Sequence, residues 1–184
     1  MRSLILLALL CAAPLARAQT VFNVDGAQST LSYTIVHKLH KVTGTSKKVE
    51  GKAALAADGK AQVVVRVPAE SFDSENVNRD SHMKEAIEAQ KFPTVELKAL
   101  AEGLAVPASF PSTVQKTFKA QLTLHGIKQL FEIPVDLSWE AADRVRATAQ
   151  FKVSLDTYKI ERPSLMFVKV EDDLILDAKI VFKK

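Results

Sequence analysis

The sequence predicts a mainly β protein built from antiparallel strands, as a barrel or a sandwich, with one short helical insert. Apolar and polar residues alternate with a period of two along about eight segments, as in strands with one buried face. Turn residues separate these segments at the spacing of hairpins. A single long polar stretch, residues 78–93, favours helix instead.

The first 18 residues have the pattern of a secretory signal peptide. Arg2 gives a positive start, residues 4–13 are apolar, and residues 16–18 form a small-residue cleavage site. The apolar run is shorter than the roughly 20 residues that span a bilayer. We therefore expect a removed leader over residues 1–18, one domain over residues 19–184, a periplasmic location and no transmembrane segment.

Cysteine content and charge argue against two classes of function, thiol chemistry and nucleic-acid binding. Cys11 is the only cysteine and lies in the expected leader, so we expect neither disulfides nor thiol chemistry in the mature domain. Loss of Arg2 and Arg17 lowers the net charge of the chain from +4 to +2. Basic residues alternate with acidic ones and form no run, which argues against a nucleic-acid partner.

The first half of the domain predicts three strands. Residues 28–37 place alternate apolar residues on one face, which ends at His37, and Gly44 is expected at a bend soon after. Residues 49–57 and 60–67 alternate in the same way. Asp58-Gly59 between them predicts a two-residue primed turn, because that turn needs positive φ.

The helical insert carries the densest polar cluster of the chain. Asn78 or Asp80 is expected to cap its N-terminus, and Met83 and Ile87 fall four apart on one face. Arg79 and His82, which lie within the same turn as Asp80, are candidate contacts for a ligand, helped by the partial positive charge of a helix start. The simpler interpretation is a capped helix with ordinary surface residues.

The second half of the domain predicts further hairpin-linked strands. Their expected ranges are 94–100, 114–124, 127–139, 144–155, 167–170 and 174–182. His125-Gly126 is expected to turn the second of these into the third. Pro163 forbids a central strand nearby, so residues 156–165 are expected to be irregular.

If the fold is a barrel, its function depends on whether the interior is packed with side chains or encloses a cavity. A closed eight-stranded barrel has room for packed side chains or for one small ligand. The inward candidates are mostly aliphatic, which fits either an apolar cavity or a plain packed core. The positions expected to line the interior are Leu31, Tyr33, Ile35, Val63, Val65, Val95, Leu97, Phe118, Leu122, Ile133, Val135, Leu176 and Ile180.

Four stretches resemble a known family. They are residues 29–37 followed by Gly44, Arg79-Asp80-Ser81-His82-Met83 followed by Lys91-Phe92-Pro93, residues 122–127, and residues 170–180. In order and spacing the chain resembles the YceI-like family of exported polyisoprenoid-binding proteins. It departs from the family pattern at Ser46, where an aromatic residue usually follows the glycine, and at residues 86–88, where an aromatic pair is usual.

The resemblance implies a lipocalin-like, eight-stranded antiparallel barrel that holds an isoprenoid tail, such as that of a polyprenyl phosphate or a quinone. It implies a binding or carrier protein for an amphipathic lipid. The residues expected at the headgroup end are His37, Arg79, His82 and Arg162. For His37 the alternative is an ordinary strand-end histidine.

Other functions are weighed against this one. His37 and His40 are three apart, and on a strand they would face opposite sides, so we expect no metal site. Gly-rich phosphate loops, His-Glu-x-x-His helices and Gly-x-Ser-x-Gly elbows are absent from the sequence, and we expect no cofactor and no enzyme. The rival hypothesis is a periplasmic stress-related interaction protein with a packed barrel and no stored lipid. A homodimer is left open.

Overall fold

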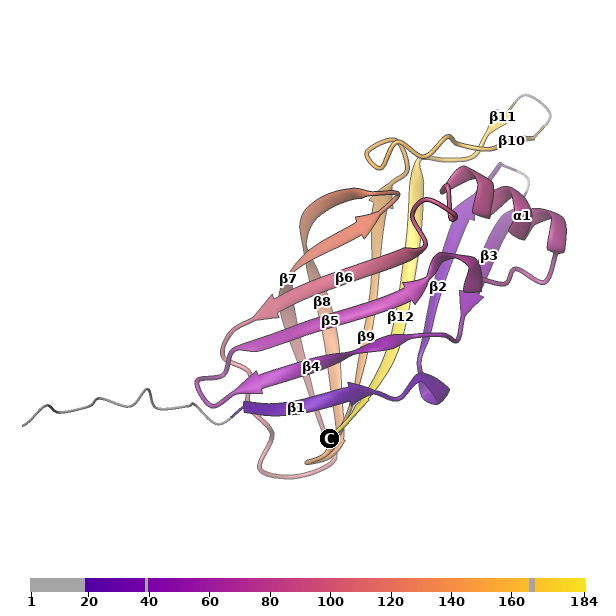
Figure 1. Ribbon diagram of the computed structural model, residues 1–184. Coiled ribbons are helices and arrows are strands. Elements are labelled where there is room, and N and C mark those ends of the chain that lie inside the picture. The colour runs from indigo at the N-terminus through magenta and orange to yellow at the C-terminus, as the bar shows by residue number, and fades with distance from the viewer. Residues whose placement is uncertain (1–18, 39, 166–167) are drawn as a thin grey trace, which may run out of the picture.

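The computed structural model describes residues 19–38, 40–165 and 168–184 (Figure 1). The expected leader lies outside these residues. The fold is mainly β, with a closed eight-stranded antiparallel barrel, which confirms the predicted fold class. In order around the barrel the strands are β1 (Gln19–Val24), β4 (Glu50–Ala56), β5 (Ala61–Pro68), β6 (Thr94–Ala101), β7 (Ser112–Leu124), β8 (Ile127–Ala141), β9 (Arg144–Ser154) and β12 (Asp173–Lys183).

The barrel closes through β12, which has different partners along its length. Its end pairs with β1 at Val24↔Phe182, and its first two thirds pair with β2 (Thr30–Val36). The short 3₁₀ helix η1 (Gly26–Gln28) carries the chain from one partner to the other. Ser29 fixes this crossing, because its buried hydroxyl accepts from the N–H of Val181 at 2.9 Å and donates to the carbonyl of Asp25 at 2.7 Å.

One end of the barrel carries the remaining elements (Figure 1). The β2 strand continues into a hairpin with β3 (Lys41–Ser46), and the 3₁₀ helix η2 (Ala69–Ser71) leads into the helix α1 (Val77–Ala86). The short pair β10 (Ser164–Leu165) and β11 (Val168–Lys169) lies at the same end. At the opposite end, Phe22 and Trp139 pack edge to face with ring centroids 5.8 Å apart.

Two local predictions are wrong. Gly44 is not at a bend but lies within β3 opposite Tyr33. The β4–β5 turn is not a two-residue primed turn, since Ala56 N–H donates to the carbonyl of Lys60 at 2.9 Å across three residues that end in Gly59 at φ 81°. That is the turn-plus-bulge alternative, in which only the last residue needs positive φ. The two-residue turn with two positive φ values occurs instead at His125 (φ 51°) and Gly126.

The helix also differs from its prediction. It begins one residue earlier than expected and ends at Ala86 rather than running on towards Pro93. Its cap is Asn76, whose side chain accepts from the N–H of Arg79 at 3.1 Å, and not Asn78 or Asp80. The Asp80 carboxylate reaches back over the first turn to Ser74 instead. No helix among the described residues is long and apolar enough to cross a membrane.

Candidate functional site

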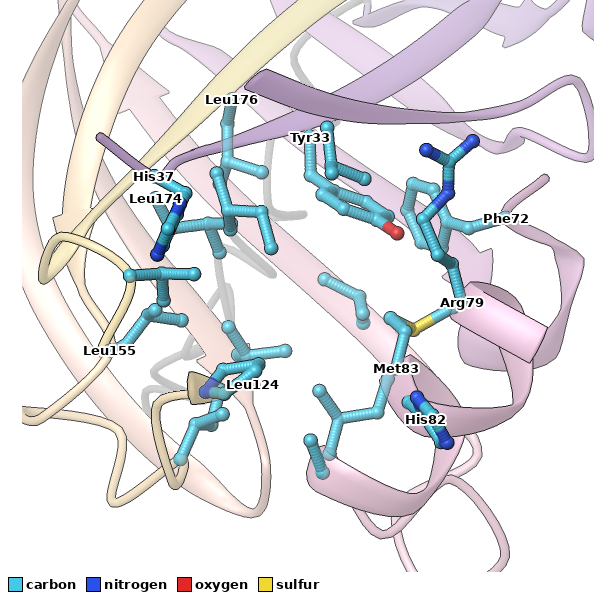
Figure 2. Close-up of a pocket in the computed structure, with 18 of the residues that line it drawn as sticks. Tyr33, His37, Phe72, Arg79, His82, Met83, Leu124, Leu155, Leu174 and Leu176 are labelled. Carbon is cyan, nitrogen blue, oxygen red and sulfur yellow. The ribbon is translucent and has the colours of Figure 1, made fainter. Parts of the chain in front are cut away.

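A cavity of about 250 Å³ lies inside the helix-bearing end of the barrel (Figure 2). Strands β2 and β12, helix α1 and the segment after β9 form its walls. Most of the lining side chains are apolar, and they are Leu31, Tyr33, Ile35, Val42, Phe72, Met83, Ala86, Ile87, Val95, Leu124, Leu155, Ile160, Pro163, Val170, Leu174 and Leu176. The polar ones are His37, His40, Arg79, His82 and Ser164.

Helix α1 forms one wall of this cavity. Met83 and Ile87 both line it, which confirms the face predicted from their spacing. A polar network holds the start of the helix against the strands. Asp80 accepts from the N–H of Ser74 at 3.0 Å and from its hydroxyl at 2.6 Å, and the buried Ser46 shares a 2.6 Å hydrogen bond with Ser71.

Tyr33 provides a buried hydroxyl within the cavity. Its ring packs edge on against Phe72 with centroids 5.5 Å apart and lies over Gly44, whose missing side chain leaves the space. Burial, followed by the nearby carboxylate of Asp80, raises the pKa of Tyr33 to about 12. The hydroxyl is therefore neutral at ordinary pH and offers a donor to a ligand.

Arg79 and His82 place cationic and titratable groups at the edge of the cavity. Both side chains are exposed to solvent on α1 and both line the cavity (Figure 2). The Arg79 guanidinium donates from Nη2 to the carbonyl of Ser74 at 2.7 Å, which orients it along the helix start. Part of its fork remains available, because a guanidinium carries five N–H donors.

His37 and His40 complete the polar edge on the opposite wall. Their backbones pair with each other, since each backbone N–H donates to the carbonyl of the other, at 2.9 and 3.2 Å. Their rings therefore come to the same side, with centroids 5.4 Å apart, and not to opposite sides as strand geometry predicts. His37 is buried, and its Nε2 lies 3.2 Å from the carbonyl oxygen of Val168.

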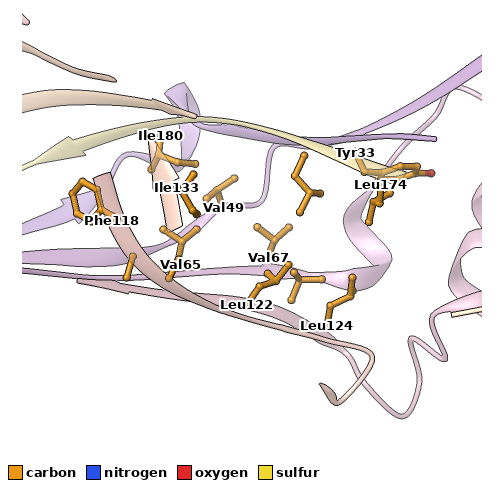
Figure 3. Packing of buried hydrophobic residues seen from close by; sticks show 14 of the residues in the cluster. Tyr33, Val49, Val65, Val67, Phe118, Leu122, Leu124, Ile133, Leu174 and Ile180 are labelled. Atoms are coloured by element: carbon orange, nitrogen blue, oxygen red, sulfur yellow. The ribbon is translucent and has the colours of Figure 1, made fainter. Parts of the chain in front are cut away.

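A second cavity of about 100 Å³ lies deeper, towards Trp139. Its walls are entirely apolar and include small side chains such as Ala99, Ala147 and Ala149. A layer of packed side chains separates the two cavities. Figure 3 shows Val67 and Leu122 between Phe118 and the first-cavity residue Leu174.

The predicted lining residues divide between these cavities. Leu31, Tyr33, Ile35, Val95 and Leu176 line the first, and Val63, Val65, Leu97, Phe118, Ile133, Val135 and Ile180 line the second. Leu122 is buried but lines neither.

The predicted headgroup residues also divide. His37, Arg79 and His82 come together around the first cavity. Arg162 lies apart from its lining, with Nε 3.0 Å from a carboxylate oxygen of Asp156. His40 and Ser164 are polar lining residues that the sequence did not predict, because the backbone pairing of His40 with His37 leaves no mark in the alternation. Within the described ranges, no group of three or more His, Cys, Asp and Glu side chains is placed to hold a metal.

The fold and the site define a class, that of closed antiparallel barrels enclosing an apolar cavity with a polar edge at one end. The sequence-family model of the YceI-like domain matches residues 22–182, so the chain belongs to the YceI-like family. Curated protein sequences gave no significant match.

Solved structures share the fold at low sequence identity. A polyisoprenoid-binding domain from Saccharophagus degradans, implicated in plant cell wall breakdown, is 17% identical with a TM-score of 0.72, over 88% of this chain and 97% of that one. BcnA from Burkholderia cenocepacia is 17% identical with a TM-score of 0.68, over 86% and 98%. The YCEI protein of Campylobacter jejuni is 13% identical with a TM-score of 0.61, over 81% and 88%.

Proposed function

We propose that this protein is an exported carrier that binds an amphipathic isoprenoid lipid, with the tail in the barrel and the headgroup beside Arg79. The observation that carries the proposal is the cavity of about 250 Å³, which combines almost wholly apolar walls with a polar edge at one end. Ligand pockets are commonly of this kind, with many apolar groups for affinity and a few polar groups for orientation.

Burial supplies the affinity for the tail. Each CH₂ removed from water contributes about 0.8 kcal/mol, so a short length of branched hydrocarbon binds without directional contacts. The walls are aliphatic side chains with the single aromatic pair Tyr33 and Phe72, a surface that accepts branched chains of differing shape. A relative of the same fold is itself described as a polyisoprenoid-binding domain, which supports this choice of tail.

The polar edge favours an anionic or carbonyl-bearing headgroup. Arginine presents a planar fork of donors that matches phosphate geometry, and the neutral hydroxyl of Tyr33 adds a further donor. Asp80, the nearest carboxylate on the same helix turn, is engaged by Ser74. Phosphate and quinone oxygens therefore both fit this edge, whereas a cationic headgroup would be repelled by the positive charge of Arg79.

The proposed location and role follow from the same features. Residues 1–18 carry the secretory pattern, so we place the protein in the periplasm. An isoprenoid lipid that leaves a membrane exposes its tail to water, and a closed barrel shields that tail. Binding rather than catalysis is the function that such walls serve, because they offer few groups for acid–base or nucleophilic chemistry.

Native mass spectrometry tests the proposal. The protein is incubated with polyprenyl phosphate and a long-chain quinone, freed of excess lipid, and weighed intact, and we expect one retained lipid per chain. Ala86→Trp fills the cavity from the helix side and should abolish retention. Val77→Trp on the same helix is the control, since that position is 83% exposed and lies away from the cavity. Failure of the native protein to retain either lipid, or equal retention by Ala86→Trp, would contradict the proposal.

A further inference from the structure

The barrel wall has a seam between β8 and β9. The two strands pair from Ala141↔Arg144 only as far as Asp136↔Thr148. Beyond that point residues 127–135 of β8 and 149–154 of β9 are not joined by a backbone ladder. Pro134 follows two residues beyond Asp136 on the unpaired side and has no N–H to donate, so the ladder ends close to a position where the sequence removes a donor.

Side chains close the seam. At the helix end, Nδ1 of His125 lies 2.8 Å from the carbonyl oxygen of Tyr158, and the Tyr158 hydroxyl donates to the carbonyl of Leu122 at 3.3 Å. Between these contacts and the ladder, the rings of Phe131 and Phe151 meet across the seam with centroids 5.4 Å apart. Both rings are only partly buried. Parting them breaks no hydrogen bond of the sheet.

The second cavity lies directly behind this seam. Ile133 and Val135 of β8 and Ala149 and Phe151 of β9 all belong to its lining. Phe151 therefore faces the seam on one side and the cavity on the other. An apolar group that passed between the two phenylalanine rings would enter the second cavity at once.

The route from the first cavity is obstructed. Val67 and Leu122 are 1% and 2% exposed, and neither lines a cavity (Figure 3). Both project from strands that are paired on either side, so their backbones are fixed. Protein interiors are packed as densely as organic crystals, and threading a chain past this layer would require several buried side chains to move together.

We infer that the second cavity is a subsite for the end of a hydrocarbon chain, and that this end enters sideways between Phe131 and Phe151. The inference rests on the proposed lipid-binding function and adds a subsite and a path to it. The size fits an end rather than a whole tail, since an engineered cavity of about 150 Å³ binds benzene. A cavity of about 100 Å³ therefore takes a short, branched terminus.

Trp139 allows the subsite to be tested by fluorescence. It is the only tryptophan of the chain and lines the second cavity. A polyprenyl phosphate brominated at its distal end should quench this fluorescence, because a bromine atom quenches only at short range. The same lipid brominated beside its phosphate should not. Retention of the lipid without quenching by the distal bromine would overturn the subsite and leave the proposed function standing, whereas no retained lipid at all would overturn both.

The path is tested by locking the seam. In a Cys11→Ser background, Phe131→Cys and Phe151→Cys are joined by a short thiol-reactive cross-linker, and the onset of quenching is followed after mixing. We expect cross-linking to slow it about tenfold or more compared with the same variant left open. The control joins Ser138→Cys and Arg146→Cys, which already face each other in the ladder. Equal rates for the joined and open seam would overturn the path.

A variant that opens the seam gives the opposite prediction. Phe131→Ala should speed both uptake and release, because the aromatic contact across the seam is lost. Leu130→Ala is its matched control, since that neighbouring side chain is 77% exposed. Unchanged rates in Phe131→Ala, in a protein that still retains lipid, would count against the side entrance.

Discussion

Replacing Gly44 by alanine tests the packing that shapes the first cavity. A Cβ atom at this position would lie 2.4 Å from Cε1 of Tyr33, 2.6 Å from Cζ and 2.7 Å from the hydroxyl oxygen. Contacts below 3.0 Å are essentially never seen for real Cβ atoms, so the tyrosine ring must move. Phe72 packs against the ring and blocks one direction, which leaves the cavity as the space into which it can turn.

Whether Gly44→Ala raises or lowers the free energy of unfolding depends on two opposing contributions. Where the backbone accepts either residue, Gly→Ala stabilises a protein by about 0.4–1 kcal/mol through the unfolded chain. Overpacking costs about 1–3 kcal/mol. We therefore expect Gly44→Ala to lower the free energy of unfolding by about 1–2 kcal/mol and Tm by about 2–4 °C per kcal/mol for a domain of this size. Urea unfolding followed by circular dichroism measures the first and a thermal scan the second.

A double variant isolates the contact. In a Tyr33→Leu background the ring is gone, so adding Gly44→Ala should be neutral or stabilising. Lipid retention should fall in Gly44→Ala alone, because the displaced ring occupies the cavity. A single variant that is as stable as the native protein and retains lipid equally well would refute this account of the cavity.

Three further predictions concern other parts of the molecule. Burial raises the pKa of both Tyr33 and Tyr158 to about 12, so near-ultraviolet titration of the folded protein should show neither tyrosine ionising near pH 10. The contribution of the two neutral hydroxyls to the free energy of unfolding is complete below pH 10 and should be lost as pH rises through about 12. Ser29→Ala leaves a buried backbone N–H of β12 without its acceptor and should cost about 1–3 kcal/mol, seen as a lower urea midpoint with unchanged slope. Arg79→Met should weaken binding of a phosphate-headed lipid by about tenfold or more with little change in Tm, measured by calorimetry, whereas Arg66→Met on the outer face should not.

The strands could be predicted because alternation reports burial directly. Residues 118–124 and 174–182 place most of their apolar side chains on one face, and both became barrel strands with the predicted faces inward. The strand β1 was missed, since its six residues are few and only Phe22 among them is buried. The barrel therefore closes through β1, a strand whose alternation is too short to be recognised in the sequence.

The site was harder to predict than the fold. Arg79 and His82 were found because they lie close together in sequence on one helix turn, so local spacing predicts their neighbourhood. His40 and Phe72 reach the same cavity from other elements, and only tertiary packing brings them there. Arg162 was predicted at the headgroup end although it lies outside the four family-like stretches, and in the structure it pairs with Asp156 and does not line the cavity.

The two glycines of the family-like motifs show what sequence can and cannot say. Gly44 and Gly126 stand out as isolated glycines beside apolar runs, which marks a close approach without naming the partner. The partners are the ring of Tyr33 for the first and the ring of Phe92 for the second, where a Cβ would lie 2.4 Å from Cε1. These contacts join the helical insert and the strands into one end of the barrel.

A crystal structure of the complex with a polyprenyl phosphate tests the central claim most directly. The account predicts hydrocarbon density inside the first cavity among Tyr33, Met83 and Leu176, with phosphate oxygens within hydrogen-bond distance of Arg79. An empty cavity in crystals of a protein that retains the lipid, with the lipid seated on the outer face of the sheet, would contradict it.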